Sequence, residues 1–146
     1  MIPRYGRPPE PGRRYDPRPG AYALLCRGDA CLVTFQEAPA PEFQLPGGGV
    51  DPGEGPLRAL HREVLEETGW TIVGARRLGA YRRFTYMPEY RRWAEKLCHV
   101  YLARPALCRG APSEAGHSAV WMPLADAVRV LASAGDRAVA AAALCR

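Results

Sequence analysis

The stretch GGVDPGEGPLRALHREVLEETGW, residues 48–70, predicts a glycine-rich turn that runs directly into a helix. Pro56 suits the first helical position, because its missing N–H would have no partner there, and Gly55 before it is an acceptable cap. Gly69 favours the left-handed conformation that ends a helix. Apolar residues at i, i+3 and i+7 predict one buried stripe on this helix, formed by Leu57, Leu60 and Val64.

Three glutamates share an adjoining face of the predicted helix, because Glu63, Glu66 and Glu67 stand at i, i+3 and i+4. Like charges at these spacings destabilise a helix by roughly 0.2–0.5 kcal/mol per pair, and no lysine follows four residues on. A bound hard cation such as Mg²⁺ or Mn²⁺ would remove the repulsion. A solvated acidic face is the alternative, and the three glutamates alone leave both interpretations open.

The full spacing of the stretch resembles the signature of the Nudix hydrolases. Every charged position and both glycines fit, and a motif with this many fixed positions is far more specific than a short glycine motif. Only Trp70 departs from the pattern, since the family usually has an aliphatic residue there. The matching residues are Gly48, Glu54, Arg62, Glu63, Val64, Glu66, Glu67 and Gly69.

The order of apolar runs predicts an α/β domain. A hairpin is expected from 21–26 and 31–35, and a brief strand from 43–46. Further strands are expected at 71–73, 77–86, 96–103 and 119–122, and helices at 124–133 and 137–145, the last capped by Asp136. A long loop is expected at 104–118. The Nudix resemblance implies an α/β/α sandwich around a mixed β-sheet.

Residues 1–19 are rich in proline and arginine and offer little to a core, so they predict an extended N-terminal arm. Such an arm is either mobile or laid over the body of the protein or a partner subunit. Residues 20–146 are then expected to form the catalytic domain of the family, as a monomer or a homodimer.

The resemblance implies hydrolysis of a nucleoside diphosphate linked to another group, by attack of water on phosphorus. It also implies a Mg²⁺ or Mn²⁺ cofactor, with Glu67 as principal ligand and the carbonyl of Gly47 as backbone ligand. Glu63 and Glu66 share metal binding or act as base. Arg62 and Glu54 are expected to support the site from beside these ligands, and the arginine is expected to hold the carboxylates in place and lower their pKa values.

A further carboxylate from a later loop is often recruited in this family, and Glu114 is the candidate here, with an ordinary surface glutamate as the alternative. His117 is a second candidate for the same role. His61 is expected to pack within the helix, and His99 to have a structural role in a strand.

The substrate wall is expected in the aromatic, basic segment 81–93. Alternate core residues of a strand are the other interpretation of this segment. The resemblance leaves the nucleotide open, with nucleoside triphosphates and oxidised guanine nucleotides among the candidates. The residues expected to bind substrate are Arg82, Arg83, Phe84 and Tyr86.

The charge of the chain indicates which kinds of partner it could bind, and its cysteines and apolar runs indicate the compartment. The formal charge is +5, and residues 76–109 carry nine basic side chains against two acidic ones. Such a surface would attract a polyanion, and a nucleotide phosphate qualifies as well as nucleic acid does, with ordinary solvated surface arginines as the alternative. A small nucleotide is expected in preference to nucleic acid. An RNA 5′-end pyrophosphohydrolase and a non-catalytic nucleotide sensor are therefore the alternatives to a small-nucleotide hydrolase. Five cysteines without a C-x-x-C pair fit reduced thiols and a cytoplasmic protein, and no apolar run is long enough for a membrane span.

Overall fold

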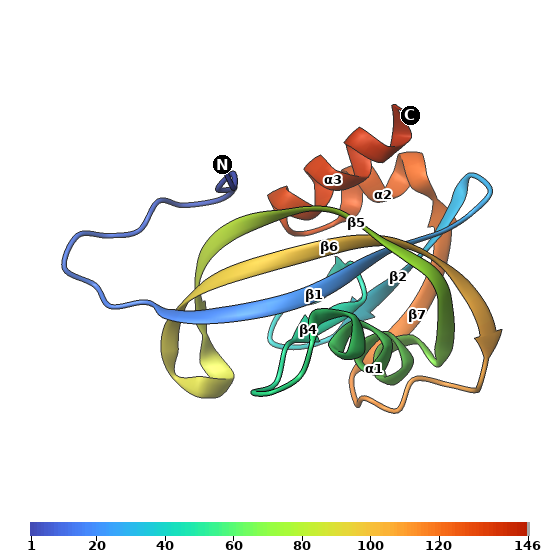
Figure 1. Cartoon of the computed structure of the whole chain (residues 1–146), viewed down its shortest axis with the longest axis horizontal. Coiled ribbons are helices and arrows are strands. Elements are labelled where there is room, and N and C mark those ends of the chain that lie inside the picture. Colours follow the sequence, from blue (N-terminus) through green and yellow to red (C-terminus); the bar gives the residue numbers. More distant parts are fainter. Residues whose placement is uncertain (146) are drawn as a thin grey trace.

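The central strand β1 (Asp16–Arg27) pairs with neighbours on both sides and places the rest of the sheet. It forms an antiparallel hairpin with β2 (Ala30–Gln36) and runs parallel to β6 (Arg92–Cys108), so the sheet is mixed. The computed structural model describes residues 1–145, and its main strand order is β3-β2-β1-β6-β5 (Figure 1). The other strands are β3 (Glu42–Gln44), β4 (Gly47–Gly49), which pairs with β1, β5 (Trp70–Met87), and β7 (His117–Pro123), which pairs with β2.

Helices cover both faces of this sheet, because side chains of β1 alternate between them. On one face, Ala21 and Ala23 join a buried cluster with Leu60 of α1 (Pro56–Thr68). On the other face, Leu24 joins a cluster that includes residues of α2 (Leu124–Val130) and α3 (Ala134–Leu144). Figure 1 shows α1 on one side of the strands and α2 and α3 on the other. The predicted α/β/α sandwich around a mixed sheet is confirmed.

Helix α1 begins and ends as its sequence predicts. Gly55 precedes Pro56 in an extended conformation, and Gly69 ends the helix with φ 79°, donating its N–H to the carbonyl of Leu65. The predicted stripe is wrong at Leu57, which is 48% exposed. The buried face consists instead of Ala59, Leu60, Val64, Glu67 and Thr68.

The two strands predicted after α1 are a single strand, β5, because β-bulges allow the chain to bend without leaving the sheet. Register shifts occur between Val73 and Arg76 and again between Arg77 and Gly79. Its partner β6 continues to Cys108, so the loop predicted at 104–118 is shorter and lies between Cys108 and His117.

The final helix is capped by Ser133, whose side chain accepts a hydrogen bond from the N–H of Asp136. The prediction that Asp136 caps this helix is therefore wrong. Asp136 lies three residues into the helix region and is buried, where its carboxylate accepts a hydrogen bond from the hydroxyl of Tyr81 at 2.6 Å.

The N-terminal arm lies along the exposed edge of β5 in the structure. Tyr5 donates its N–H to the carbonyl of Arg82, and Arg82 returns a hydrogen bond to the carbonyl of Pro3. The ring of Tyr5 stands edge-on to Tyr81 at 5.7 Å. Residues 16–19 already belong to β1, so regular structure begins within the segment 1–19.

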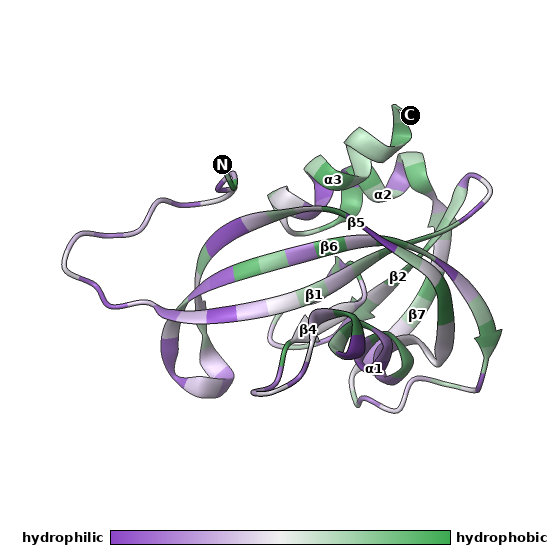
Figure 2. Ribbon diagram, viewed as in Figure 1, coloured by the Kyte–Doolittle hydropathy of each residue, from purple (hydrophilic) through white to green (hydrophobic). Residues whose placement is uncertain are grey.

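Hydropathy is distributed as this layering requires (Figure 2). Green, apolar colour is prominent along α3, whereas the N-terminal arm and the left-hand ends of β5 and β6, near the turn that joins them, are more polar. Within residues 1–145, no helix combines the length and apolar character that a membrane span needs. All five cysteines are free thiols.

Candidate active site

The glycine turn brings a backbone donor to the principal glutamate of α1. Gly47 donates its N–H to Oε1 of Glu67 at 2.8 Å, from a backbone with φ 149°. A Cβ at Gly47 would lie 2.2 Å from the carbonyl oxygen of Ala21, so no other residue fits there without moving β1. The turn therefore holds one oxygen of Glu67 and leaves the other facing the cavity.

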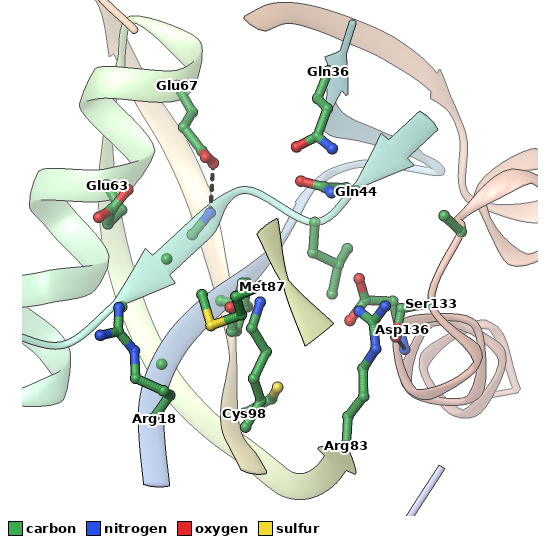
Figure 3. Close-up of a pocket in the computed structure, with 18 of the residues that line it drawn as sticks. Arg18, Gln36, Gln44, Glu63, Glu67, Arg83, Met87, Cys98, Ser133 and Asp136 are labelled. Carbon is green, nitrogen blue, oxygen red and sulfur yellow. Dashed lines mark hydrogen bonds between the residues drawn. The ribbon is translucent and has the colours of Figure 1, made fainter. Parts of the chain in front are cut away.

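The next glycine makes room for a second carboxylate. A Cβ at Gly48 would lie 2.5 Å from the carboxylate carbon of Glu63, so this carboxylate rests directly against the backbone of the turn. Glu63 and Glu67 are four residues apart on one face of α1, and both line the same cavity. Figure 3 shows the two side chains entering it from the helix.

Arg62 connects the carboxylates that surround the glycine turn. Its Nε and Nη2 donate to the two oxygens of Glu54 at 2.9 and 2.8 Å, and its Nη1 donates to Glu63 at 2.9 Å. Nη2 also donates to the carbonyl of Gly49. These bonds lower the pKa of Glu54 to about 2, with the hydrogen bonds from Arg62 as the main cause. A planar guanidinium can make this two-pronged contact, and a lysine cannot.

Burial raises the pKa values of Glu63 and Glu67 at the cavity, whereas the hydrogen bonds from Arg62 lower the pKa of Glu54. Desolvation raises the pKa of Glu67 to about 8, although the hydrogen bond from Gly47 lowers it and the neighbouring Glu114, Glu63 and Glu66 raise it further. Burial also raises the pKa of Glu63, against the lowering effect of Arg62. The site thus concentrates carboxylates that repel one another when all are ionised.

The loop before β7 supplies Glu114, and the first residue of β7 is His117. Ser113 and Glu114 both donate their N–H to the carbonyl of Glu66, at 2.9 and 3.0 Å, which ties the loop to the end of α1. Nε2 of His117 lies 4.0 Å from a carboxylate oxygen of Glu114, and its Nδ1 lies 3.7 Å from Oε2 of Glu67. The structure therefore brings both candidates to the acidic face of the helix.

The donor set suits a hard divalent cation. Carboxylate oxygens of Glu63, Glu66 and Glu114 lie within 4.8 Å of one another, and so do ligand atoms of Glu67, Glu114 and His117. Oxygen-rich sites of this kind favour Mg²⁺ or Mn²⁺. Nδ1 of His117 is buried and has no hydrogen-bond partner within the described chain, so this nitrogen is available to a ligand.

The cavity beside these residues has a volume of about 270 Å³. Its floor consists of alternate residues of three adjacent strands, all on the α2 and α3 face of the sheet. One end contains Glu63 and Glu67, and the other contains Ser133 and Asp136 (Figure 3). The floor residues are Arg18, Gly20 and Tyr22 of β1, Lys96 and Cys98 of β6, and Tyr81, Arg83 and Met87 of β5.

The four residues expected to bind substrate lie on β5, where successive side chains point to opposite faces of the sheet, so they do not all face the cavity. Arg83 lines the cavity. Arg82 pairs with Glu95 at 3.3 Å, and Phe84 packs against Tyr15. Tyr86 is exposed and packs against Trp93. Because neighbouring strand residues face opposite sides of a sheet, only Arg83 of the four reaches the site.

Other predicted roles also have a place in the structure. His61 is exposed, so the expectation that it packs within the helix is wrong. His99 is half-buried in β6, where burial lowers its pKa. Sequence reasoning missed Arg18, Lys96 and Asp136 at the cavity, since each lies outside the signature and only strand register unites them.

Comparison with known proteins agrees with this geometry. The family model described as NUDIX domain matches residues 16–143. A protein of Bacillus subtilis (strain 168), named provisionally as an 8-oxo-dGTP diphosphatase, is 34% identical over 70 residues, which are 48% of this chain and 47% of that protein. An RNA pyrophosphohydrolase of Helicobacter pylori is 47% identical over 57 residues, which are 36% of this chain and 37% of that protein. The chain thus spans less than half the length of these curated relatives.

A solved structure extends the similarity over most of the chain. The MutT NUDIX hydrolase from Burkholderia pseudomallei is 27% identical with a TM-score of 0.71, and the match covers 86% of this chain and 97% of that one. The family match, the shared fold and the complete glutamate and glycine signature agree. The chain belongs to the Nudix family.

Proposed function

We propose that this chain is a divalent-metal-dependent pyrophosphohydrolase that cleaves the diphosphate linkage of a small nucleotide by attack of water on phosphorus. One observation carries the proposal. Carboxylates from a helix and from a later loop converge beside a glycine turn whose conformation only glycine satisfies. The relatives named as a diphosphatase and a pyrophosphohydrolase support the same class of reaction.

The proposed ligands of the cation, Mg²⁺ or Mn²⁺, are Glu63, Glu66, Glu67 and Glu114, with the carbonyl of Gly47. A cation held there would neutralise charge on the phosphoryl oxygens and lower the pKa of a water molecule. Because Arg62 engages Glu63 and the N–H of Gly47 engages Glu67, these two carboxylates are oriented before substrate enters.

The proton released by the attacking water needs an acceptor near the acidic cluster. Glu63 and Glu66 are available for this role, since both lie within the group that includes Glu114. Glu66 is the more accessible of the two, with 42% of its side chain exposed against 15% for Glu63. Arg62 and Glu54 act indirectly, by fixing the position of Glu63.

A screen of nucleoside diphosphate-linked compounds and nucleoside triphosphates with Mg²⁺ tests this function. Products are separated so that the broken bond is identified, and the screen is repeated with Mn²⁺ and with EDTA. We expect metal-dependent release of a nucleoside monophosphate. Tight nucleotide binding without turnover under every metal condition would instead identify a sensor.

A second candidate, cleavage at the 5′ end of RNA, is favoured by one specific observation. Several arginines of β5 and β6, including Arg76, Arg77 and Arg104, are exposed in the structure and are available to contact phosphates along a chain. RNA binding would then weaken steeply with salt, with a slope that reports the number of phosphates contacted. A cytoplasmic location, proposed from the cysteine usage, is compatible with either substrate.

A further inference from the structure

Three basic side chains stand in register across the cavity floor, and we call Arg18, Lys96 and Arg83 the basic row. Arg18 of β1 is the direct partner of Lys96 of β6, and Lys96 is the direct partner of Arg83 of β5. All three line the cavity. With adjacent strands roughly 4.8 Å apart, the row crosses about 10 Å of the floor.

The row is not neutralised within the protein. Across the described chain, none of its three side chains has an ion pair or hydrogen bond to another side chain. Arg18 lies over the ring of Tyr90 at 4.6 Å. Like charges directly opposite on neighbouring strands are destabilising. Burial, and next the charge of Arg83, lower the pKa of Lys96, so these two cations affect each other.

The acids near the row do not remove this imbalance. Asp136 is buried and accepts hydrogen bonds from the hydroxyl of Tyr81 and the backbone of Leu45. Glu89 also lines the cavity, but its side chain is exposed to solvent. The other acids of the cavity also have partners or an assigned role: Glu42 accepts hydrogen bonds from Gln36 and Gln44, and Glu63, Glu67 and Glu114 belong to the proposed cation site. The three basic groups therefore face the cavity without a carboxylate partner of their own, and an anionic ligand would compensate them.

The basic row runs from the glycine turn, beside the proposed catalytic glutamates, toward α3. Arg18 lies at the glycine turn, where its guanidinium is 3.8 Å from the position of a Cβ on Gly49, whereas Arg83 extends toward Asp136 and α3 (Figure 3). The row therefore begins beside the acidic cluster and leads away from it. An anionic chain held at its near end by the cation proposed for the cluster would lie along the row.

We propose that the basic row binds a polyphosphate chain, and that the substrate carries at least one anionic phosphate beyond the diphosphate bound at the acidic cluster. This inference rests on the proposed function and specifies its substrate class as nucleoside polyphosphates. A nucleoside diphosphate sugar, whose second group is neutral, would leave the far end of the row uncompensated.

Binding of inorganic phosphates in EDTA tests the row without turnover. Orthophosphate, pyrophosphate and tripolyphosphate are titrated into the full chain by calorimetry. We expect affinity to rise with chain length, and Lys96→Gln and Arg83→Gln each to weaken tripolyphosphate about tenfold, the value of one charge-assisted hydrogen bond. Lys96→Arg keeps the charge and should retain most of the binding.

Arg76→Gln is the matched control, because it removes the same charge from an exposed site on β5 outside the cavity. It should bind tripolyphosphate within twofold of wild type, and thermal melting establishes that all variants are folded. Equal affinity for the three phosphates would reveal a single phosphate site, and an equal loss in Arg76→Gln would reveal a net-charge effect. Either result would overturn the proposal that the basic row binds a polyphosphate chain.

Kinetic measurements test the proposed role of the basic row separately from the proposed catalytic function. Arg83→Gln, at the far end of the row, should raise KM at least tenfold for a nucleoside triphosphate and less than twofold for a nucleoside diphosphate sugar. Equal effects on both compounds would overturn the substrate class. Glu67→Gln should abolish turnover yet bind tripolyphosphate in EDTA at least as well as wild type, so failure of the catalytic assignment is visible in turnover alone.

Discussion

Replacing Glu67 with glutamine should remove a pH dependence from the stability of the metal-free protein. Glu67 is 6% exposed, and burial raises its pKa from 4.5 to about 8. Between these pH values the folded protein retains the proton that the unfolded chain has released. The folded state then binds more protons, so the free energy of unfolding falls as pH rises through this interval.

The size of the effect follows from the same pKa. A change from 4.5 to about 8 corresponds to about 5 kcal/mol, at about 1.4 kcal/mol for each tenfold change in proton affinity. Relaxation and water entry reduce such penalties in proteins. We therefore expect wild type to lose at least about 2 kcal/mol between pH 5 and pH 8 in EDTA. Glutamine is neutral throughout and can still accept the hydrogen bond from Gly47.

Urea unfolding at pH 5, 6, 7 and 8 in EDTA measures this difference. Glu67→Gln should match wild type near pH 5 and exceed it by about 2 kcal/mol or more at pH 8. Glu37→Gln, an exposed glutamate outside the cavity, is the control and should follow the wild-type slope. Mg²⁺ at pH 8 should stabilise wild type more than Glu67→Gln. If the free energies of unfolding of wild type and Glu67→Gln changed in parallel with pH, the argument that burial raises the pKa of Glu67 would be refuted.

Three further predictions concern the surroundings of the site. Gly47→Ala should destabilise the fold by more than about 2 kcal/mol, because the new Cβ would meet backbone atoms. Gly48→Ala should keep its melting temperature within a few degrees of wild type but lose at least tenfold in activity, because its Cβ would displace the side chain of Glu63. Equal losses of stability in urea for the two variants would contradict this. Arg62→Lys keeps the charge but not the paired bonds to Glu54, so kcat should fall at least tenfold with a small change in melting temperature; wild-type kcat would contradict it. A chain shortened to begin at Asp16 should stay folded, whereas one that begins at Gly20 should melt several degrees lower than it, because residues 16–19 pair with β6; equal melting temperatures would contradict this.

Local signals were sufficient to predict helix α1 and its acidic face. Pro56 and Gly69 fix the two ends by conformations that depend on neighbouring residues alone, and the spacing of the glutamates follows from the helical period. Leu57 shows the limit of such signals, since its spacing places it on the apolar stripe while almost half of it is exposed in the structure. Helical spacing predicts which residues share a face, but tertiary packing decides how far along the helix that face is covered.

The cavity depends on information that no single segment contains. Arg18, Lys96 and Arg83 are far apart in the sequence and become neighbours only when β1, β6 and β5 pair in their observed register. Strand alternation separates Arg83 from Arg82, and the bulges of β5 make that alternation hard to count from its beginning. Asp136 has the appearance of a helix cap until the hydroxyl of Tyr81 is placed beside it.

The most direct test of the central claim is the turnover number of Glu67→Gln with Mg²⁺, on the nucleotide that wild type hydrolyses best. The account predicts a fall in kcat of about 10³ or more, equivalent to about 4 kcal/mol, in a protein that melts at or above the wild-type temperature. A folded Glu67→Gln protein that turns over within tenfold of wild type would contradict the assignment of the acidic cluster as the catalytic centre.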